Sequence, residues 1–536
     1  MNIRSPITLV FALAVGLGLI ASGAAAETPQ HGGTLVFTVP ASDMPSMDGH
    51  QETTFAVVHA TAPHYSLLIR VDPTDPKAKR MEGDVAESWS LSKDRKSYIF
   101  KIRKGIKFHD GSPLTAKDVV ASFEHMIDPP SGVISPRKAY FSMVESVSHP
   151  DDYTVVFKLK YPTSAVIGVL AMPFNYIYKA DLLAKDPNWY KTHIMGSGPF
   201  LFKEQHMGAD WIGVRNPDYF RKGEPYLDGY QAIYTPKEVV ELQALRGGRS
   251  MIQFRGFPPS SREELQKAMG GSLRVQESPW NCGLYAVPNT FKKPFDDVRV
   301  RQALNLAVDR WSGSEYLSKI AIVKTVGGYV FPGHELAMTD AELQKDLPGY
   351  SRDIVAQRKE ARRLLKEAGI PEGFKFKLNN RSTDQPYKIV GTWLIDQWRQ
   401  IGLNVEQQVL PTGPFFAELR KNPPEFDVTM DFNCQTVVNP QVDVSQLISA
   451  DRTDANSGHY IDRKLDEMYD AQLQEPDEAK QKEILKKFQI YVAEHGYYIN
   501  TLWWHRIVLS NTEVQGWNVS PSHYINNQLD TVWLKQ

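Results

Sequence analysis

Alternating apolar and polar positions predict β-strands in the first part of the chain. The segment TLVFTVP, at residues 34–40, is rich in β-branched residues and ends at a proline, as strands often do. Three longer segments, at residues 87–108, 144–162 and 198–220, alternate apolar and polar residues on both sides of a turn-forming stretch. Each of these three segments predicts a hairpin-like β-element.

Apolar residues at helical spacing predict helices that interleave with the strands. Residues 295–310 and 358–373 repeat apolar side chains three and four positions apart. The second helix is expected to stop at Gly369, with Pro371 just beyond, because glycine ends helices readily and proline cannot continue them. Residues 388–410 are expected to pass from a helix into a strand. The fold class is therefore mixed α/β, with its domains joined by ordinary strands.

The segment FHDGSPLTAKDVVASFEHM, at residues 108–126, puts a histidine beside an aspartate and raises the question of a catalytic or metal site. Residues 110–113 are typical of a turn, and Thr115 and Asp118 have the spacing of a capping box that begins a helix. His109 has no metal-ligating residue four positions later. We therefore expect His109 to be structural and to bond the turn.

The N-terminus has the pattern of a secretory signal peptide. A basic Arg4, an apolar run from Ile7 to Ile20 and the triplet Ala24-Ala25-Ala26 predict cleavage after residue 26. An uncleaved anchor is the alternative, but the apolar run is short for a membrane span. We expect a soluble periplasmic protein that is not embedded in the membrane.

The composition excludes some partners and favours a disulfide. The chain has 61 basic and 62 acidic residues, and loss of Arg4 leaves a net charge of about −2. A nucleic-acid or anionic-membrane partner needs a clustered basic surface, so neither is expected. The cysteines are Cys282 and Cys434, and an even count in an exported protein favours a bridge over two separate buried thiols.

Short enzyme motifs fail on inspection. His334-Glu335 begins like a zinc-protease helix, but Met338 stands where the second histidine belongs. The triplet Gly196-Ser197-Gly198 lacks the spacing of a nucleophile elbow. Catalysts built from distant residues stay possible, because triads are recognised by geometry. We assign no catalytic residue, no metal site and no cofactor.

A series of motifs in one order resembles the extracellular solute-binding proteins of family 5, the dipeptide- and oligopeptide-binding class that serves ABC importers. The strongest marks are residues 85–126, GSGPFLF at 196–202, NPDYF at 216–220, PYLDGY at 225–230 and KPFDDVRVRQALNLAVDR at 293–310. The resemblance spans essentially all of the mature chain. It implies a two-lobed periplasmic binding protein of the large three-domain, type II class, in which hinge closure traps the ligand in a cleft between lobes.

The resemblance also implies domain boundaries. Domain I, a discontinuous lobe, comprises residues 27–66, 195–281 and 505–536. A β-rich subdomain is inserted at 67–194, and domain III, the second lobe, comprises 282–504.

Two family features bear on the ligand. Oligopeptide-binding members join the first crossing segment to a cleft loop by a disulfide, and Cys282 and Cys434 fall at the matching places. Peptide-binding members place an aspartate two residues after the second cysteine to hold the peptide ammonium, and Thr436 stands there. Burial of an ammonium group costs free energy, and a threonine hydroxyl does not offset this cost as a negatively charged carboxylate does. Either Asp431 or Asp443 substitutes, or the ligand is not an ordinary free-amino peptide. We favour the second, because this class also carries opines, sugars and other solutes.

The candidate ligand-binding residues combine aromatic rings with hydrogen-bonding groups, as ligand clefts do. Arg381 is the candidate partner for a ligand carboxylate, although an exposed loop arginine is the alternative. The tryptophans either stack on ligand or fill core. The full set is Asp43, Met44, Trp280, Asn281, Arg381, Asn433, Gln435, Thr436, Trp503 and Trp504.

The resemblance implies a monomeric solute-binding component of an ABC importer that docks on permease subunits. A true di- or oligopeptide-binding protein with a shifted carboxylate is the first alternative. A secreted hydrolase is the second, and it needs a nucleophile or acid–base pair that the sequence does not display. A third is a binding protein that reports to a chemoreceptor.

Overall fold

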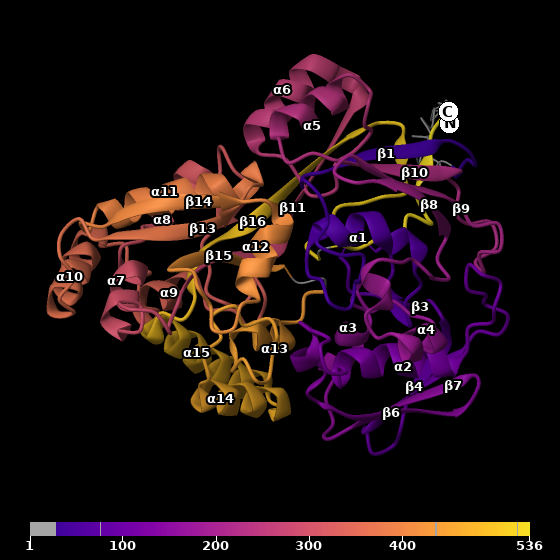
Figure 1. The fold of residues 1–536 in the computed structure, drawn as a ribbon, viewed down its shortest axis with the longest axis horizontal. Coiled ribbons are helices and arrows are strands. Elements are labelled where there is room, and N and C mark those ends of the chain that lie inside the picture. Colours follow the sequence, from indigo (N-terminus) through magenta and orange to yellow (C-terminus); the bar gives the residue numbers. More distant parts are fainter. Residues whose placement is uncertain (1–27, 76, 435–436, 523) are drawn as a thin grey trace, which may run out of the picture.

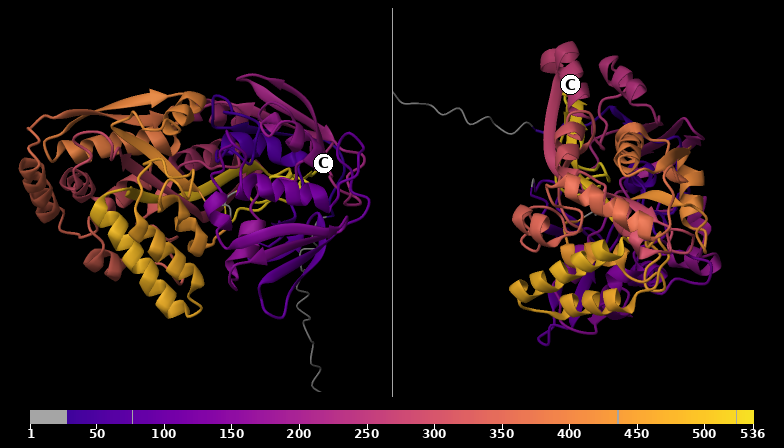
Figure 2. Two further views of the ribbon diagram at one scale, coloured as in Figure 1. Left: turned by 60° about the horizontal axis from the view of Figure 1, so that its bottom comes forward. Right: turned by 90° about the vertical axis from the view of Figure 1, so that its left-hand side faces the viewer.

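The chain folds into two lobes joined by a pair of long strands. The computed structural model describes residues 28–75, 77–434, 437–522 and 524–536. The strands β11 (Leu273–Pro288) and β16 (Ile499–Asn511) pair antiparallel and run from one lobe into the other (Figures 1 and 2). The signal peptide expected at residues 1–26 lies outside the described residues.

The first lobe holds two four-stranded sheets, ordered β1-β10-β9-β8 and β4-β5-β7-β6, and the small pair β2-β3. Its strands are β1 (Thr34–Val39), β2 (Ile69–Val71), β3 (Met81–Gly83), β4 (Ala86–Leu91), β5 (Ser97–Ile102), β6 (Val144–Asp151), β7 (Thr154–Leu159), β8 (Phe200–His206), β9 (Asp210–Arg215) and β10 (Gly229–Tyr234). Its helices are α1 (Phe55–Thr61), α2 (Ala116–Ile127), α3 (Ala165–Leu170), α4 (Ala180–Lys185), α5 (Glu238–Arg246) and α6 (Pro259–Met269).

The second lobe is built on a six-stranded sheet ordered β12-β16-β11-β15-β13-β14, to which the long strands contribute. The other strands of this sheet are β12 (Val323–Thr325), β13 (Lys375–Arg381), β14 (Asn404–Leu410) and β15 (Val428–Cys434). The helices are α7 (Val298–Leu306), α8 (Arg310–Leu317), α9 (Asp340–Asp346), α10 (Ile354–Glu367), α11 (Ile389–Arg399), α12 (Thr412–Leu419), α13 (Pro440–Asp443), α14 (Arg463–Gln474) and α15 (Glu478–His495).

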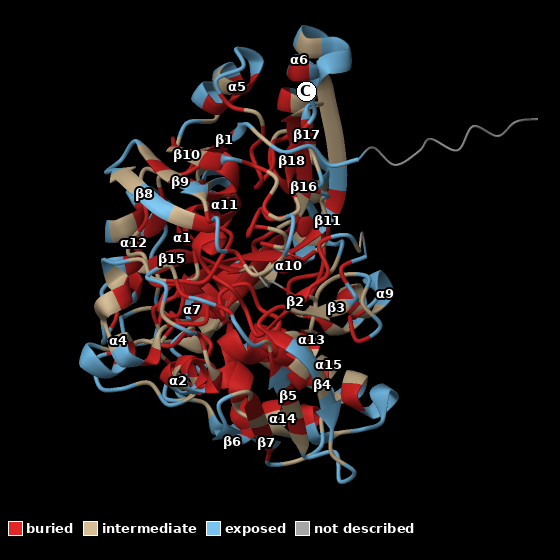
Figure 3. Cartoon of the chain, turned by 90° about the vertical axis from the view of Figure 1, so that its right-hand side faces the viewer, coloured by how far each residue is buried: buried red, intermediate tan, exposed pale blue. Residues whose placement is uncertain are grey.

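The predicted hairpins and helices are confirmed. The pairs β4–β5, β6–β7 and β8–β9 are antiparallel, at the three segments in which apolar and polar residues alternate. Helix α10 ends at Glu367, and Gly369 follows with φ of +74°, a backbone conformation that favours glycine. Buried residues concentrate inside the lobes and around the long strands (Figure 3).

The chain end returns to the first lobe. After β16, the strands β17 (Val514–Gln515) and β18 (Trp533–Leu534) pair with each other. The backbone N–H of Gln536 donates to the Gln30 side chain at 2.9 Å, which places the end of the chain beside the first described residues. The buried Asp530 receives an ion pair from Arg70 at 2.6 Å and a hydrogen bond from Tyr219 at 3.1 Å. These contacts fasten the C-terminal tail to the lobe that contains the N-terminus. The domain boundaries expected from the sequence stay a prediction.

The segment around His109 lies in close backbone contact with residues 196–198. The backbone N–H of His109 donates to the carbonyl of Gly196, and Nε2 lies 3.2 Å from the carbonyl of Gly198. A side chain at either glycine would collide with His64 or its neighbours, since a Cβ at Gly196 would lie 2.0 Å from the His64 carbonyl oxygen. Burial lowers the pKa of His109 to about 4, so the ring is neutral at pH 7. His109 therefore bonds the 196–198 segment rather than its own turn.

The capping box at the start of α2 gives a testable contribution to stability. The buried Asp118 carboxylate accepts hydrogen bonds from the backbone N–H of Thr115 at 2.8 Å and of Ala180 at 2.9 Å. Asp118→Ala leaves both donors without this partner and is expected to cost about 2 kcal/mol of unfolding free energy. Asp181→Ala, which removes an ion pair with Lys117 from a side chain that is 74% exposed, is the control and should change stability by less than about 0.5 kcal/mol. Urea unfolding measures both, and equal effects would contradict the assignment.

The pairing of the two long strands is interrupted where they pass between lobes. Pro279 pairs with His505, and the next partners are Gly283 and Trp503, so the register shifts across residues 279–283. Such a bulge bends a strand and leaves residues outside the ladder. Residues 280–282 of β11 therefore stand outside its ladder with β16.

Candidate functional site

A cavity of about 580 Å³ lies between the lobes. The first lobe lines it with Arg137 and Phe174, and the second with Phe416, Asn433 and Ser457, among others. This volume lies within the range of small-molecule sites, and the wall mixes rings with polar groups, as such sites do.

Direct bonds between the lobes surround the cavity. Arg420 of the second lobe forms an ion pair with the buried Glu52 of the first at 2.7 Å. The backbone N–H of Ser135 donates to the Asp454 carboxylate at 2.7 Å. These contacts join residues far apart in sequence, so separation of the lobes has to break them.

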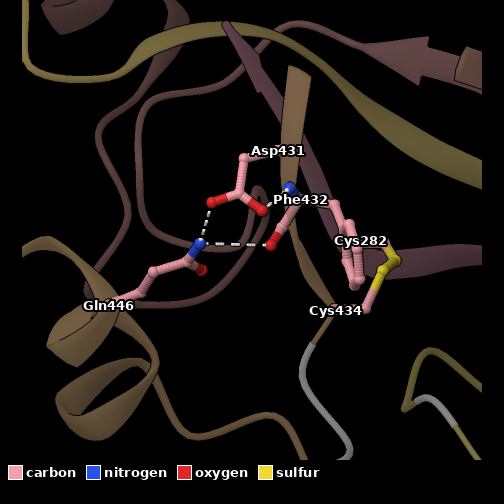
Figure 4. Close-up of a disulfide and its surroundings, with 5 residues drawn as sticks. All are labelled: Cys282, Asp431, Phe432, Cys434 and Gln446. Atoms are coloured by element: carbon pink, nitrogen blue, oxygen red, sulfur yellow. Dashed lines mark hydrogen bonds between the residues drawn. A yellow bond between two sulfur atoms is a disulfide. The ribbon is translucent and has the colours of Figure 1, made fainter. Parts of the chain in front are cut away.

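A buried carboxylate forms part of the cavity wall next to the disulfide (Figure 4). Asp431 accepts hydrogen bonds from the Gln446 side chain at 2.9 Å, the Phe432 backbone at 2.8 Å and the Ser457 hydroxyl at 2.5 Å. Burial raises its pKa to about 6. The structure joins Cys282 of β11 to Cys434 of β15 in a disulfide, as the family resemblance implied.

A second buried carboxylate, Asp443, is less completely bonded. One oxygen accepts from the Asn281 side chain at 3.2 Å and the Asn439 backbone at 3.3 Å, while the other has no partner among the described residues. Asn433 donates to the Asp443 backbone carbonyl at 2.7 Å. Burial raises the pKa of Asp443 to about 7, so the ionised carboxylate is costly in this environment.

Asp443 predicts a pH dependence of stability in the ligand-free protein. Its pKa is about 7 in the fold against 3.8 for a free aspartate, so the folded state holds the proton more tightly. The stabilisation is fully present below pH 4 and is lost as the pH rises to about 7, with a total on the order of 4 kcal/mol. Asp443→Asn imitates the protonated form. In urea unfolding, we expect the advantage of the variant over wild type to be about 2.5 kcal/mol larger at pH 7.5 than at pH 5, and the same difference at both pH values would contradict the prediction.

An arginine–aromatic cluster lies beside the cavity. The guanidinium of Arg381, at the end of β13, lies over Phe416, a cavity residue, at 5.2 Å and over Phe55 of the first lobe at 4.6 Å. Arg381 donates to the Thr54 hydroxyl at 2.9 Å, across the lobe boundary. The guanidinium of Arg255 lies over three rings of the cluster, at 4.2 Å from the centre of Phe55, 4.9 Å from that of Trp504 and 5.5 Å from that of Tyr387.

The structure brings some of the predicted ligand residues together. Asn433 lines the cavity, and Asn281 is linked to it through Asp443. Arg381 and Trp504 meet in the arginine–aromatic cluster through Tyr387. Trp280 packs on Trp504 at 5.1 Å between ring centres.

Other predicted residues lie elsewhere. Trp503 lines a different cavity, of about 530 Å³, and packs on Phe331. Met44 belongs to the core of the first lobe, and Asp43 accepts a hydrogen bond from the Met44 backbone. Gln435 and Thr436 lie outside the described residues. The roles of all ten residues in ligand binding stay predictions.

Sequence reasoning did not select Arg255, Phe55 or Tyr387. Arg255 stands in the apolar stretch MIQFRGFPP, at residues 251–259, and is 1% exposed. A lone charged residue inside an apolar stretch was the available signal, because a buried charge needs a specific reason.

Comparison with known proteins gives the family context. The family profile described as bacterial extracellular solute-binding proteins, family 5 Middle, matches residues 80–452. Di/tripeptide-binding protein 1 of Pseudomonas aeruginosa (strain UCBPP-PA14) is 28% identical over 441 residues, covering 76% of this chain and 78% of that protein. Glutathione-binding protein GsiB of Escherichia coli O1:K1 / APEC is 27% identical over 433 residues, covering 79% and 80%.

The fold has close counterparts among solved structures. The binding protein AgaA of A. tumefacien R10, in complex with agropinic acid, superposes with a TM-score of 0.82 at 22% identity, covering 94% of this chain and 99% of that one. The expected fold, a mixed α/β periplasmic binding protein, is thereby confirmed. In the described part of the chain, no helix is long and apolar enough to cross a bilayer. With its family profile matched over more than half of its length, the chain belongs to the bacterial extracellular solute-binding proteins of family 5.

Proposed function

We propose that this protein captures a small solute between its lobes and delivers it to the permease of an ABC importer, with no chemical step. The interlobe cavity of about 580 Å³, lined from both lobes, is the observation that carries the proposal. A solute bound there contacts both lobes, so its binding energy favours the closed arrangement. Family membership supports the importer role.

The solute is proposed to lack the free α-ammonium group of an ordinary peptide and to present a carboxylate to Arg381. Thr436 replaces the family's ammonium-binding aspartate. Asp431, which lies nearby in the sequence, already accepts three hydrogen bonds from neutral donors. Relatives and structural neighbours differ in what their names say they bind, from di- and tripeptides to glutathione and agropinic acid, so the family leaves room for such a ligand.

A peptide with a free amino group is the second candidate, and one observation favours it. Asp443 is buried, one of its oxygens has no hydrogen-bond partner among the described residues, and Asn433 of the cavity wall donates to its backbone carbonyl. A ligand ammonium there would pair with the ionised carboxylate. Its binding would then weaken as the pH falls below about 7, because protonation removes the negative charge.

A thermal-shift screen of the mature protein tests both candidates. The panel pairs free di- to pentapeptides with their N-acetylated forms and adds glutathione and agropinic acid. A ligand at about 100 times its dissociation constant adds roughly 2.7 kcal/mol of stability. Stabilisation by free peptides that acetylation and Asp443→Asn both abolish would establish the second candidate. Stabilisation by compounds without a free ammonium group supports the first. If no solute stabilises the protein in this or wider panels, the binding function itself is wrong.

Cellular experiments test the remaining parts. The exported protein is proposed to be periplasmic and monomeric, so its N-terminal sequence should begin at Glu27 and its mass in solution should be that of one chain. Deletion of the gene should abolish uptake of the solute. Loss of chemotaxis with intact uptake would indicate a sensory role instead.

A further inference from the structure

The structural buried arginines of this chain are satisfied by a carboxylate, as Arg70 is by Asp530, or by backbone carbonyls. Arg137 donates to the carbonyls of three residues in the segment 49–52. Arg310 donates to the carbonyls of Asn500 and Gly349, among others, and Arg506 donates to that of Phe254. Each guanidinium is buried, and carbonyl oxygens replace the water that it lost.

Arg255 and Arg381 depart from this pattern. Both are buried, yet Nε and Nη2 of Arg255 and Nη1 of Arg381 have no hydrogen-bond partner among the described residues. The Arg381 guanidinium donates to the hydroxyls of Thr54 and Thr412 and interacts with that of Tyr387, and none of these groups is a carboxylate. Neither guanidinium forms an ion pair with a described carboxylate. Among the described residues, the two buried cations therefore lack both an ion-paired carboxylate and a full set of acceptors. The buried Glu241 lies within electrostatic range of Arg255, but burial raises its pKa to about 8, so it carries little charge at pH 7.

The two cations lie close to each other across the lobe boundary. Both guanidinium carbons lie over the Phe55 ring, at 4.2 and 4.6 Å from its centre, which limits their separation to 8.8 Å. Arg255 and Phe55 belong to the first lobe and Arg381 to the second. Closure of the lobes thus brings like charges together in a desolvated place, and this is unfavourable unless an anion enters with them.

A histidine adds donor capacity at the same place. His59, one turn after Phe55 in α1, is buried, and neither ring nitrogen has a partner among the described residues. Burial and then the charges of Arg506 and Arg255 lower its pKa well below the ordinary value, so the ring is neutral and offers one N–H group. Arg255, Arg381 and His59 together therefore have more N–H groups without a described partner than one carboxylate can accept.

We infer that the solute carries two acidic groups, as a dicarboxylate does, which Arg255 and Arg381 bind between the lobes. This inference rests on the proposed function and names its ligand class. Each guanidinium offers a planar fork that binds a carboxylate through two hydrogen bonds. Neutralisation of both charges by one dianion removes the repulsion that opposes closure, so ligand charge controls the lobe equilibrium.

The first test is whether replacement of a buried arginine raises or lowers the stability of the ligand-free protein. Arg255→Met keeps a long apolar side chain against the rings and removes an uncompensated charge, so its melting temperature should equal or exceed that of wild type. Arg310→Met is the matched control, because it removes an arginine whose protons are already accepted, and it should melt lower. If Arg255→Met and Arg310→Met lose stability equally, the inference is wrong.

Anion binding is the second test, and inorganic sulfate is the first probe. At constant ionic strength, replacement of chloride by sulfate should raise the melting temperature of wild type more than that of Arg255→Met or Arg381→Met. The general stabilising effect of sulfate is common to all three and cancels in the comparison. Equal shifts in the three proteins would overturn the inference.

Matched acids separate this inference from the proposed function. N-acetylglutamate carries two carboxylates and N-acetylglutamine carries one, and any acid found in the screen is compared with its monoamide in the same way. The diacid should bind at least about 30-fold more tightly than the monoamide, and Arg255→Met should abolish the difference. Tight binding of a neutral or singly charged solute would leave the binding function standing and refute the two-acid ligand.

Discussion

Replacement of both cysteines by alanine is expected to lower the stability of the second lobe by about 5 kcal/mol, since the bridge closes a loop of 152 residues in the unfolded chain. For a unit of this size, the melting temperature should fall by about 10 °C. Cys282 and Cys434 are also direct neighbours in the ladder of β11 and β15, which persists without the bridge. The folded structure and the affinity for solute should therefore change little.

Calorimetry of wild type, of reduced wild type and of the double variant measures this effect. Reduced wild type is the control and should have the same melting temperature as the double variant. A much smaller loss, with folding intact in both proteins, would mean that the unfolded chain gains little freedom when the bridge is absent. A loss of solute affinity without a loss of stability would mean that the bridge shapes the cavity wall near Asp431.

Trp504→Ala is expected to cost about 3–5 kcal/mol of unfolding free energy, as does removal of a large buried ring elsewhere. Trp504 is 1% exposed and packs on Trp280 and Tyr387 at 5.1 and 5.9 Å between ring centres. The indole also lies 4.9 Å from the Arg255 guanidinium. If Arg255 binds the solute, the same substitution should also weaken solute affinity, by at least about 1 kcal/mol.

Two further tryptophans serve as controls for Trp504. Both Trp503 and Trp504 line the other cavity, but among the described contacts of Arg255 the indole is that of Trp504, so Trp503→Ala should reduce stability and leave solute affinity unchanged. Trp89 on β4 is only half buried, so its removal should cost about 1–2 kcal/mol. Denaturation and titration of the three variants distinguish a core role from a ligand role. Unchanged affinity in Trp504→Ala would assign that ring to the core.

Local sequence rules account for much of the fold. The strands β4 to β9 follow the alternation of side chains, because one face of each hairpin is buried and the other is solvated. The starts and ends of α2 and α10 follow from caps that act within a few residues. Such features need no knowledge of distant segments.

The site depends on distant segments, and this limits prediction. Arg255, Phe55 and Arg381 come from three remote parts of the chain, and the tertiary fold brings both guanidinium groups over one ring. The apolar stretch around Arg255 indicates burial, but it does not show whether carbonyls satisfy the guanidinium, as they do for the buried Arg137. The family resemblance supplied the disulfide and the two lobes. It did not point to Arg255 or Phe55.

The interruption in the pairing of β11 with β16 has a spectroscopic consequence. Trp280 follows Pro279, where the pairing of β11 with β16 is interrupted, and Trp504 lies on the partner strand beside it. A change in the angle between the lobes would move these two edge-to-face indoles relative to each other and to the Arg506 guanidinium, 4.9 Å from the Trp280 ring. Their intrinsic ultraviolet emission should therefore report opening and closing of the lobes in the unlabelled protein, on whatever timescale the motion takes place.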